Sequence, residues 1–201
     1  MGKADEYVLA IRKMGRYDLN RLWKDHSKDE FDDSFWKKGK VLEYVALRAF
    51  EIERKGCVTY PYEVYYTACE GYEKPIEQID GAVHVDDLYA LVECKDYEDD
   101  NINVEPLAKL RNQLTRRHSN LFGIFFSATD FTTPAEILVG HMAPQLIILW
   151  SKEDFEFCLK NGCFIPCLKT KYKVAVEACV YNYPFRLYHT EYKLPVSNPL
   201  F

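Results

Sequence analysis

The chain has 201 residues, of which 48% are hydrophobic and 28% are charged, and its formal net charge is −5. This composition predicts a globular protein with a core, and the length fits one domain with an appended piece. The acidic balance excludes a surface that attracts polyanions everywhere, so any nucleic-acid contact must come from a local patch. No stretch reaches the roughly 18 apolar residues of a membrane span, and the N-terminus has no signal-peptide core. We therefore expect a cytoplasmic protein without membrane contact.

Two helices are expected before the first strand. Residues 5–24 repeat apolar side chains at loosely helical spacing, and Gly15 weakens the middle of that segment. After an acidic run, residues 34–56 form a second amphipathic pattern that ends in glycine. Glu43 lies one step off its apolar stripe, so an exposed helical position is one interpretation of this residue.

The next segments favour strands. Residues 57–68 are rich in tyrosine and β-branched side chains, and Pro61 keeps this strand irregular or at a sheet edge. Residues 78–95 then predict two strands joined by a turn at Asp86 and Asp87. Antiparallel pairing across that turn gives one apolar face. On the other face it sets Asp80 opposite Glu93, Gln78 opposite Lys95 and His84 opposite Tyr89.

The second half of the chain alternates helices and strands. We expect a helix from Asn103, a buried strand at 121–129, a helix with Thr133 as its N-cap, a strand at 145–150 and a helix from Ser151 to Gly162. This order predicts a mixed sheet between helices in three layers. Residues 171–180 are compatible with a helix or a strand, and the aromatic tail after them either wraps the body or faces a partner.

The seven cysteines form an odd set without a regular framework, which favours reduced thiols over disulfides. Cys158, Cys163 and Cys167 are close in sequence, but their spacing is not that of a zinc ribbon or finger. We interpret them as core or surface thiols.

The opposed carboxylates suggest chemistry. Side chains directly opposed across a strand pair are about 5 Å apart, and like charges there destabilise the pair. A divalent cation between Asp80 and Glu93 would turn that repulsion into ligation, and Mg²⁺ prefers such oxygen ligands. Lys95 lies on the same face and could orient or activate a water there. The ordinary alternative is a polar sheet face on which Glu93 pairs with Lys95.

With these elements in order, the sequence resembles the PD-(D/E)XK nuclease superfamily and, within it, the Mrr-like restriction endonucleases. The resemblance spans roughly residues 37–157. It rests on GKVLEYVALRAF, on Asp80 followed by Glu93-Cys94-Lys95, and on the segments LAKLRNQLTRR and GIFFSATDFTTPAEIL. The family pattern often has proline before the aspartate, where this chain has Ile79.

The resemblance implies a three-layer αβα restriction-endonuclease-like fold with an αβββαβ core and a mixed sheet. It divides the chain into an N-terminal helical extension (1–36), a nuclease core (37–162) and a C-terminal extension (163–201) that serves packing or oligomer contacts.

The resemblance also implies site residues. Asp80, Glu93 and the carbonyl of Cys94 become ligands of Mg²⁺, with Mn²⁺ as a substitute. Lys95 becomes the water-activating or charge-stabilising residue, and Glu43 an auxiliary acid that holds a water or a second ion. Gln78 either orders the site or is a spacer on the sheet face.

Basic residues follow the lysine strand. Arg111, Arg116, Arg117 and His118 cluster toward the end of the helix from Asn103, where they would attract phosphates or simply suit a helix C-terminus. His84 is interpreted as a groove or packing residue.

The function implied is that of a DNA endonuclease of restriction or anti-phage type. Cutting both strands takes two sites, so a homodimer or a sensor or ATPase partner subunit is expected. Three alternatives remain: an RNA-cleaving or branched-DNA-resolving enzyme of the same fold, a catalytically silent binding or scaffolding module, and an assembly subunit that acts through its aromatic tail.

Overall fold

The computed structural model describes residues 3–27, 34–65, 74–97 and 100–187. The acidic run at 28–33, Cys69 and the tail after residue 187 lie outside them. No helix in these ranges combines the length and apolar character needed to cross a membrane.

The N-terminal segment forms two helices where the sequence predicted one. Helix α1 spans Lys3–Arg12 and α2 spans Arg16–His26. Gly15 is the N-cap of α2, and its backbone nitrogen donates to Asp18 Oδ2 (3.0 Å). The glycine that weakened the helical pattern is therefore the point where the helix breaks. Helix α3 spans Lys38–Glu53, so the predicted second helix begins four residues later than expected.

A mixed five-stranded sheet in the order β1-β4-β5-β6-β7 forms the centre of the described residues. Its strands are Val58–Thr59, Gly81–Val85, Leu88–Lys95, Leu121–Ser127 and Ile147–Trp150. The β1–β4 and β4–β5 pairs are antiparallel, and β5, β6 and β7 run parallel. Helix α3, three antiparallel strands, α4 (Val104–Thr115) and β6 give the predicted αβββαβ core, which is confirmed.

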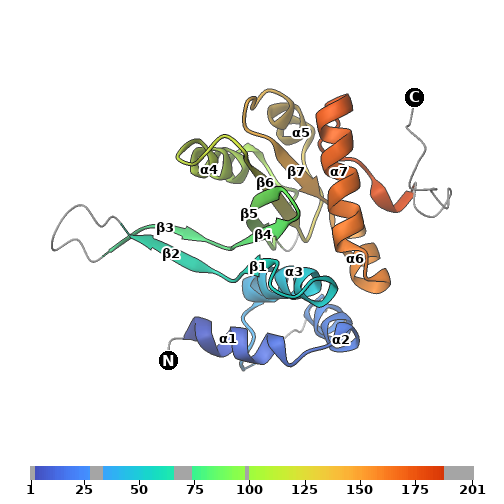
Figure 1. The fold of residues 1–201 in the computed structure, drawn as a ribbon. Helices are drawn as coiled ribbons and strands as arrows, with labels where there is room; N and C mark the ends of the chain where they lie inside the picture. Colours follow the sequence, from blue (N-terminus) through green and yellow to red (C-terminus); the bar gives the residue numbers. More distant parts are fainter. Residues whose placement is uncertain (1–2, 28–33, 66–73, 98–99, 188–201) are drawn as a thin grey trace.

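Helices cover both faces of this sheet (Figure 1). One core cluster joins α1, α2 and α3 with α6 (Lys152–Asn161) and α7 (Phe164–Ala178), against residues such as Val92 and Phe126. The other joins α4 and α5 (Thr133–Gly140) to residues such as Leu91 and Phe125. Adjacent residues of β5 and β6 thus enter opposite clusters, as the period of a strand requires.

The predicted hairpin is correct near its turn and wrong farther out. Gly81 to Val85 pair with Leu88 to Val92 in the expected register. The first arm, however, is two strands, β3 (Pro75–Ile79) and β4, separated at Asp80. Strand β3 leaves β5 and pairs with β2 (Tyr62–Tyr65), which sets Gln78 opposite Glu63, not Lys95. The β2–β3 ribbon extends away from the body in Figure 1.

Two further predictions need correction. The predicted strand at 57–68 is two short strands, β1 and β2, on either side of Pro61, and residues 66–68 lie outside the described ranges. The N-cap of α5 is Thr132, whose side chain accepts from the backbone nitrogen of Ala135. The sequence does not distinguish Thr132 from Thr133 as the N-cap, because the two threonines are adjacent.

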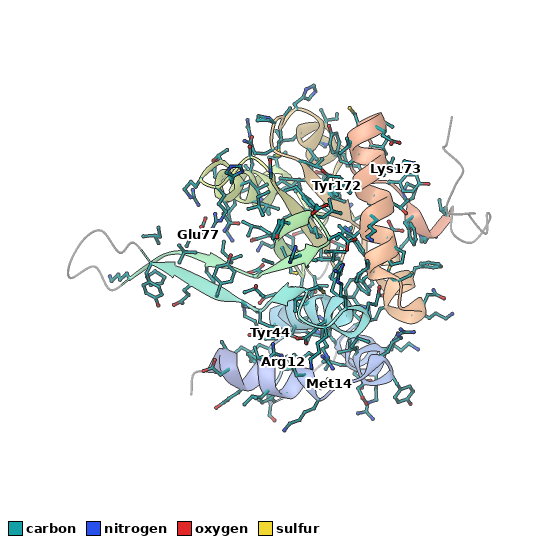
Figure 2. The ribbon with its side chains drawn as sticks, viewed as in Figure 1. Arg12, Met14, Tyr44, Glu77, Tyr172 and Lys173 are labelled. Carbon is teal, nitrogen blue, oxygen red and sulfur yellow. The ribbon has the colours of Figure 1, made fainter. Side chains whose placement is uncertain are left out.

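The N- and C-terminal helices are part of the same core as the nuclease segment. Arg48 of α3 donates to the backbone oxygen of Met14 (3.1 Å), and Arg12 lies over the ring of Tyr60. Figure 2 shows Arg12 and Met14 beside α3, which carries Tyr44. The predicted division at residues 36 and 162 remains a prediction, since the structure joins these segments through shared packing.

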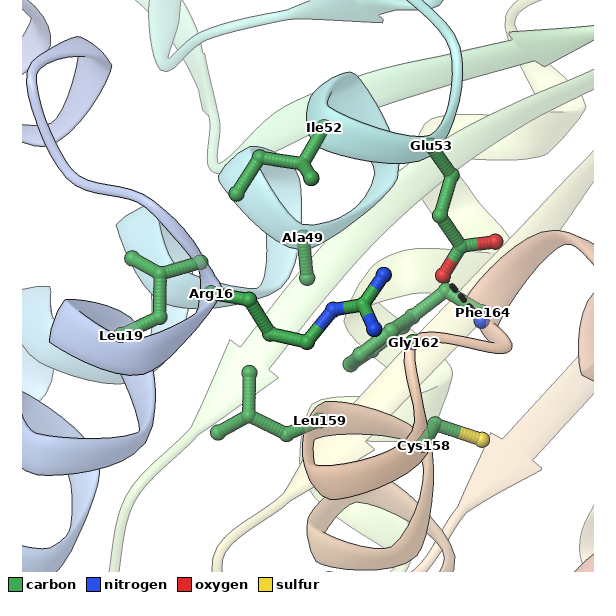
Figure 3. A pocket seen from close by; sticks show the side chains of 9 residues that line it. All are labelled: Arg16, Leu19, Ala49, Ile52, Glu53, Cys158, Leu159, Gly162 and Phe164. Atoms are coloured by element: carbon green, nitrogen blue, oxygen red, sulfur yellow. Dashed lines mark hydrogen bonds between the residues drawn. The ribbon is translucent and has the colours of Figure 1, made fainter.

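Helix α7 resolves the segment left open between helix and strand. Glu53, at the end of α3, accepts from the backbone nitrogens of Phe164 (2.6 Å) and Ile165 (2.9 Å). These nitrogens lie in the first turn of α7, where they have no acceptor within the helix, so the carboxylate caps that helix. The guanidinium of Arg16 enters the same junction (Figure 3).

Candidate active site

Asp80 lies at the break between β3 and β4. The side chain is buried, and its Oδ2 accepts a hydrogen bond from the backbone nitrogen of Cys94 (3.0 Å). Burial and the nearby charge of Glu93 raise the pKa of Asp80 above its ordinary value. The register of β4 with β5 is the predicted one, but the ladder ends at Gly81, so Asp80 lies just beyond it and interacts with Glu93 without being its ladder partner.

Glu93 is fully buried on β5, and its two oxygens have different surroundings. Oε1 lies 2.6 Å from Lys95 Nζ and 2.8 Å from Lys109 Nζ. Oε2 has no hydrogen-bond partner among the described residues. A buried acceptor without a partner costs free energy, and such atoms in folded proteins need an explanation. One explanation is that Oε2 is a ligand for a cation.

Lys95 is half-buried and contacts Glu93 and Cys94 of the same strand. Its Nζ also lies 3.3 Å from the carbonyl oxygen of Cys94, to which it donates. Burial alone would lower the pKa of Lys95, but the charges of Glu93 and Asp80 and the hydrogen bond to Glu93 raise it. Lys95 is therefore an ammonium group at neutral pH.

Glu43 is buried on α3, which does not fit its interpretation as an exposed helical residue. Both of its oxygens accept from Lys40 Nζ, at 2.8 and 2.7 Å. Burial and the charge of Asp80 raise the pKa of Glu43 to about 7, against the lowering effect of Lys40. This effect of Asp80 places Glu43 at the same site.

These groups fit a hard divalent cation. Asp80 and Glu93 supply carboxylate oxygens, one of them unpartnered, and the Cys94 carbonyl is beside them. In the described ranges no group of three or more His, Cys, Asp and Glu residues is arranged to hold a metal. A cation here would therefore depend on the two carboxylates, a backbone carbonyl and water, which is the sparse coordination Mg²⁺ accepts.

Sequence reasoning missed two lysines. Lys109 on α4 and Lys40 on α3 were not among the predicted site residues, yet each binds a site carboxylate. Lys40 and Glu43 are three residues apart on α3, a helical spacing that could have indicated their pairing. The contact of Lys109 with Glu93 gave no such sign, because it depends on how α4 crosses the sheet.

The predicted basic cluster is partly engaged. Arg116 and Arg117 both form ion pairs with Glu77 of β3, labelled in Figure 2, and Arg117 also donates to the Gln113 backbone oxygen (2.6 Å). Arg111 is half-buried on α4. The two arginines therefore tie α4 to the β2–β3 ribbon.

The remaining predicted positions lie apart from the carboxylates. Gln78 is exposed on β3 and points its backbone oxygen to Gln113 Nε2 (3.2 Å). His84 stacks on Tyr89, opposite it in the ladder, with ring centroids 4.0 Å apart. Cys158, Cys163 and Cys167 are buried free thiols that lie together at the α6–α7 junction.

Known structures were compared with this fold. The small subunit of the heterodimeric restriction endonuclease R.BspD6I superposes with a TM-score of 0.51 at 15% identity, over 89% of this chain and 99% of that one. This likeness shows the fold. The MspJI restriction endonuclease in complex with an oligonucleotide matches with a TM-score of 0.40 at 14% identity, over 82% of this chain and 35% of that one.

Among curated proteins, no match was found. The profile of the restriction endonuclease family Mrr_cat, in contrast, matches residues 53–158, which is slightly more than half of the chain. This segment contains Asp80, Glu93 and Lys95. The chain therefore belongs to the Mrr_cat family of restriction endonucleases.

Proposed function

We propose that this protein is a Mg²⁺-dependent DNA endonuclease that acts in restriction or anti-phage defence. The observation that carries the proposal is the environment of Glu93, a fully buried carboxylate with one oxygen on two lysines and the other without a partner among the described residues. Both lysines contact Oε1, so these ion pairs leave Oε2 available to a ligand such as a cation.

The ligand set follows from the same contacts. Asp80, Glu93 and the Cys94 carbonyl would hold Mg²⁺ or Mn²⁺, and Glu43 would hold an associated water or a second ion. When bound, the cation would neutralise charge on the phosphate and make nearby water more acidic. Raised pKa values at Asp80 and Glu43 support this assignment, because burial and mutual repulsion disfavour both charges until a cation compensates them.

The role of Lys95 can be narrowed. Its pKa is raised, so the side chain carries a proton at neutral pH and is a poor general base. An ammonium 2.6 Å from Glu93 can instead stabilise negative charge that develops on a phosphate, or orient a water by donating to it. Of the two roles considered for Lys95, we propose charge stabilisation.

The proposed substrate contacts lie on the neighbouring helix and ribbon. Arg111, Arg116, Arg117 and Gln78 are the proposed nucleic-acid-binding residues. Arg116 can contribute while paired with Glu77, because more than half of its side chain is exposed. Arg117 is mostly buried in the same pairing, so its contribution is the weaker of the two.

One site cuts one strand, so we propose a second copy or a partner subunit for double-strand cleavage. Support comes from the net charge of −5, which gives weak long-range attraction to DNA. It also comes from the similar structure, which is one subunit of a heterodimeric enzyme.

A plasmid assay tests the proposal. Purified protein is incubated with supercoiled plasmid in Mg²⁺ or Mn²⁺, with EDTA and the Lys95→Ala variant as negative controls and Lys173→Ala of α7 as a matched surface lysine. Nicking or linearisation that is lost in both negative controls and kept in Lys173→Ala supports it.

The same preparation is then offered single-stranded RNA and a four-way DNA junction. Preference for either over plasmid would replace the proposed substrate with one of the alternatives. Absence of cleavage, combined with Mg²⁺ binding that is equal in wild type and Asp80→Asn, would overturn the proposal in favour of a silent module.

A further inference from the structure

A groove between β3 and α4 leads to the carboxylate site. It holds about 530 Å³, and its lining includes the polar side chains of Gln78, Lys109, Asn112, Gln113 and Arg116 together with two acids, Glu77 and Glu105. Lys109 belongs both to the groove and to the site, since its Nζ lies 2.8 Å from Glu93 Oε1. The groove and the proposed site of cleavage are therefore continuous through one side chain.

The cationic side chains at the groove differ in how far their charge is already compensated by acidic partners. Glu77, on the β3 side, pairs with Arg116 and with Arg117, so much of the arginine charge is already compensated. Lys109 is different, because its partner Glu93 is shared with Lys95 and its side chain is 53% exposed, against 24% for Lys95. Of the two lysines on Glu93, Lys109 is the one that can turn toward a ligand in the groove.

The charge balance of the site points to an anionic ligand. The contacts described above join three carboxylates to three ammonium groups. The carboxylates are those of Glu43, Asp80 and Glu93, and the ammonium groups are those of Lys40, Lys95 and Lys109. With all six ionised, this set is neutral. A divalent cation would leave it positive, and a positive site between buried walls attracts phosphate.

We propose that this groove seats the phosphodiester backbone of a DNA strand, and that Lys109 moves from Glu93 to a phosphate next to the one that is cut. The inference rests on the proposed function and adds two things to it. These are the path of the DNA strand through the groove and the role of Lys109, which binds the DNA backbone next to the carboxylate site. The amide side chains of Gln78, Asn112 and Gln113 offer neutral hydrogen bonds along that path, which suits sugar and phosphate oxygens.

The test is the salt dependence of DNA binding. A short fluorescein-labelled duplex is titrated by anisotropy over a series of salt concentrations, with Ca²⁺ present so that the carboxylates carry a hard cation. Each phosphate contact contributes about −0.9 to the slope of log K against log salt. Lys109→Gln should make the slope shallower by about one contact. Lys173→Gln is the matched control, since Lys173 is 56% exposed on α7, across the molecule in Figure 2, and should leave the slope unchanged.

A gain-of-charge variant distinguishes a lost phosphate contact from misfolding. Asn112→Lys adds an ammonium to the groove and should steepen the slope by about one contact, which a damaged protein cannot imitate. Equal slopes for wild type, Lys109→Gln and Asn112→Lys would overturn the inference, as would a wild type that does not bind the duplex in Ca²⁺.

The two proposals fail in different ways. If the slopes change as expected, but wild type does not cleave plasmid and binds Mg²⁺ no better than Asp80→Asn, the groove stands and the nuclease proposal falls. If wild type cleaves and the slopes do not change, the strand follows another path and only the groove is lost.

Discussion

Asp80 is fastened to the strand of Glu93 by a hydrogen bond from the Cys94 backbone nitrogen to its Oδ2 (3.0 Å). That bond fixes the carboxylate where its charge is disfavoured, because burial and Glu93 both raise its pKa. A fold that positions an acid in this way gives up stability, and such positions concentrate at functional sites.

Replacing Asp80 by asparagine should therefore separate stability from activity. The amide oxygen can still accept from the Cys94 nitrogen, while the disfavoured charge is gone. In EDTA at pH 8 we expect Asp80→Asn to raise the free energy of unfolding by about 0.5–2 kcal/mol, the usual gain from relieving such a conflict. Urea denaturation measures this, and the plasmid assay should show loss of cleavage.

The exposed Asp130→Asn substitution is the control for a change of one charge, and it should alter neither quantity. If Asp80→Asn were instead less stable than wild type, the charge of Asp80 would be part of the structural scaffold and its assignment as a ligand would lose its support.

Glu43 gives the protein a dependence of stability on pH with a definite sign. Its pKa is raised from an ordinary 4.5 to about 7, so the folded state binds this proton more tightly than the unfolded chain. Stability from this group is fully present below about pH 4.5 and is lost as the pH rises through about 7. The loss amounts to about 3 kcal/mol at most.

The Glu43→Gln variant isolates that contribution. Urea denaturation in EDTA at pH 5 and pH 8 should show a larger fall in the free energy of unfolding for wild type than for the variant. Asp80, whose pKa is also raised, contributes with the same sign in both proteins. An equal fall in both would mean that Glu43 is ionised in the folded state throughout this range.

Local sequence determined the core of this fold. The alternation in Gly81 to Val92 and the apolar run at 121–129 predicted strands that the structure contains, and their order gave the three layers. What failed was the outer hairpin, because alternation continues unchanged through Asp80 whichever strand β3 pairs with. Strand β3 pairs with β2, and its Glu77 binds Arg116 and Arg117 just after α4, contacts between segments that no local pattern joins.

The site was predictable where one strand carries it. Glu93 and Lys95 share a face of β5 by the two-residue period, and they do meet. Lys109 contacts Glu93 from α4, and that contact depends on a helix crossing that no sequence period encodes, whereas Lys40 pairs with Glu43 at the i,i+3 spacing of one helix. Glu43 appeared off its stripe for a similar reason, since α3 is buried on more than its apolar face.

A second charged pair, far from the site in sequence, should be structural. Lys171 and Asp154 are almost completely buried and lie 2.6 Å apart, and Lys171 Nζ also donates to the backbone oxygens of Leu149 (3.1 Å) and Tyr183 (2.5 Å). Lys171→Met should cost about 3–5 kcal/mol, because it leaves a buried carboxylate uncompensated. Urea denaturation gives this value.

Adding Asp154→Leu to Lys171→Met should recover part of the loss, since the uncompensated charge is removed as well. The exposed pair of Lys173 and Glu177 (3.9 Å) serves as the comparison, and breaking it should change stability by less than about 1 kcal/mol. A Lys171→Met protein as stable as wild type would show that Asp154 reaches solvent or is protonated.

Gly162 and Gly56 separate two reasons for glycine at a positive φ. Both adopt left-handed backbone, with φ of 64° and 80°. A Cβ added at Gly56 would meet no atom within 4 Å, whereas one at Gly162 would overlap the guanidinium of Arg16 (Figure 3). Gly56→Ala should cost about 1–2 kcal/mol for backbone strain alone. Gly162→Ala also displaces the guanidinium, the far end of an exposed side chain, and should cost only about 0.5 kcal/mol more.

Truncating Arg16 tests that account directly. Arg16 is an exposed residue, so its guanidinium can swing out of the junction toward solvent when a Cβ is added. In the Arg16→Ala background the extra cost of Gly162→Ala should disappear, leaving the value measured for Gly56→Ala. Urea denaturation of the four proteins supplies the cycle. If the extra cost persisted without the guanidinium, the strain would lie in the α6–α7 turn itself, and Arg16 would not be the wedge that joins α2 to that turn.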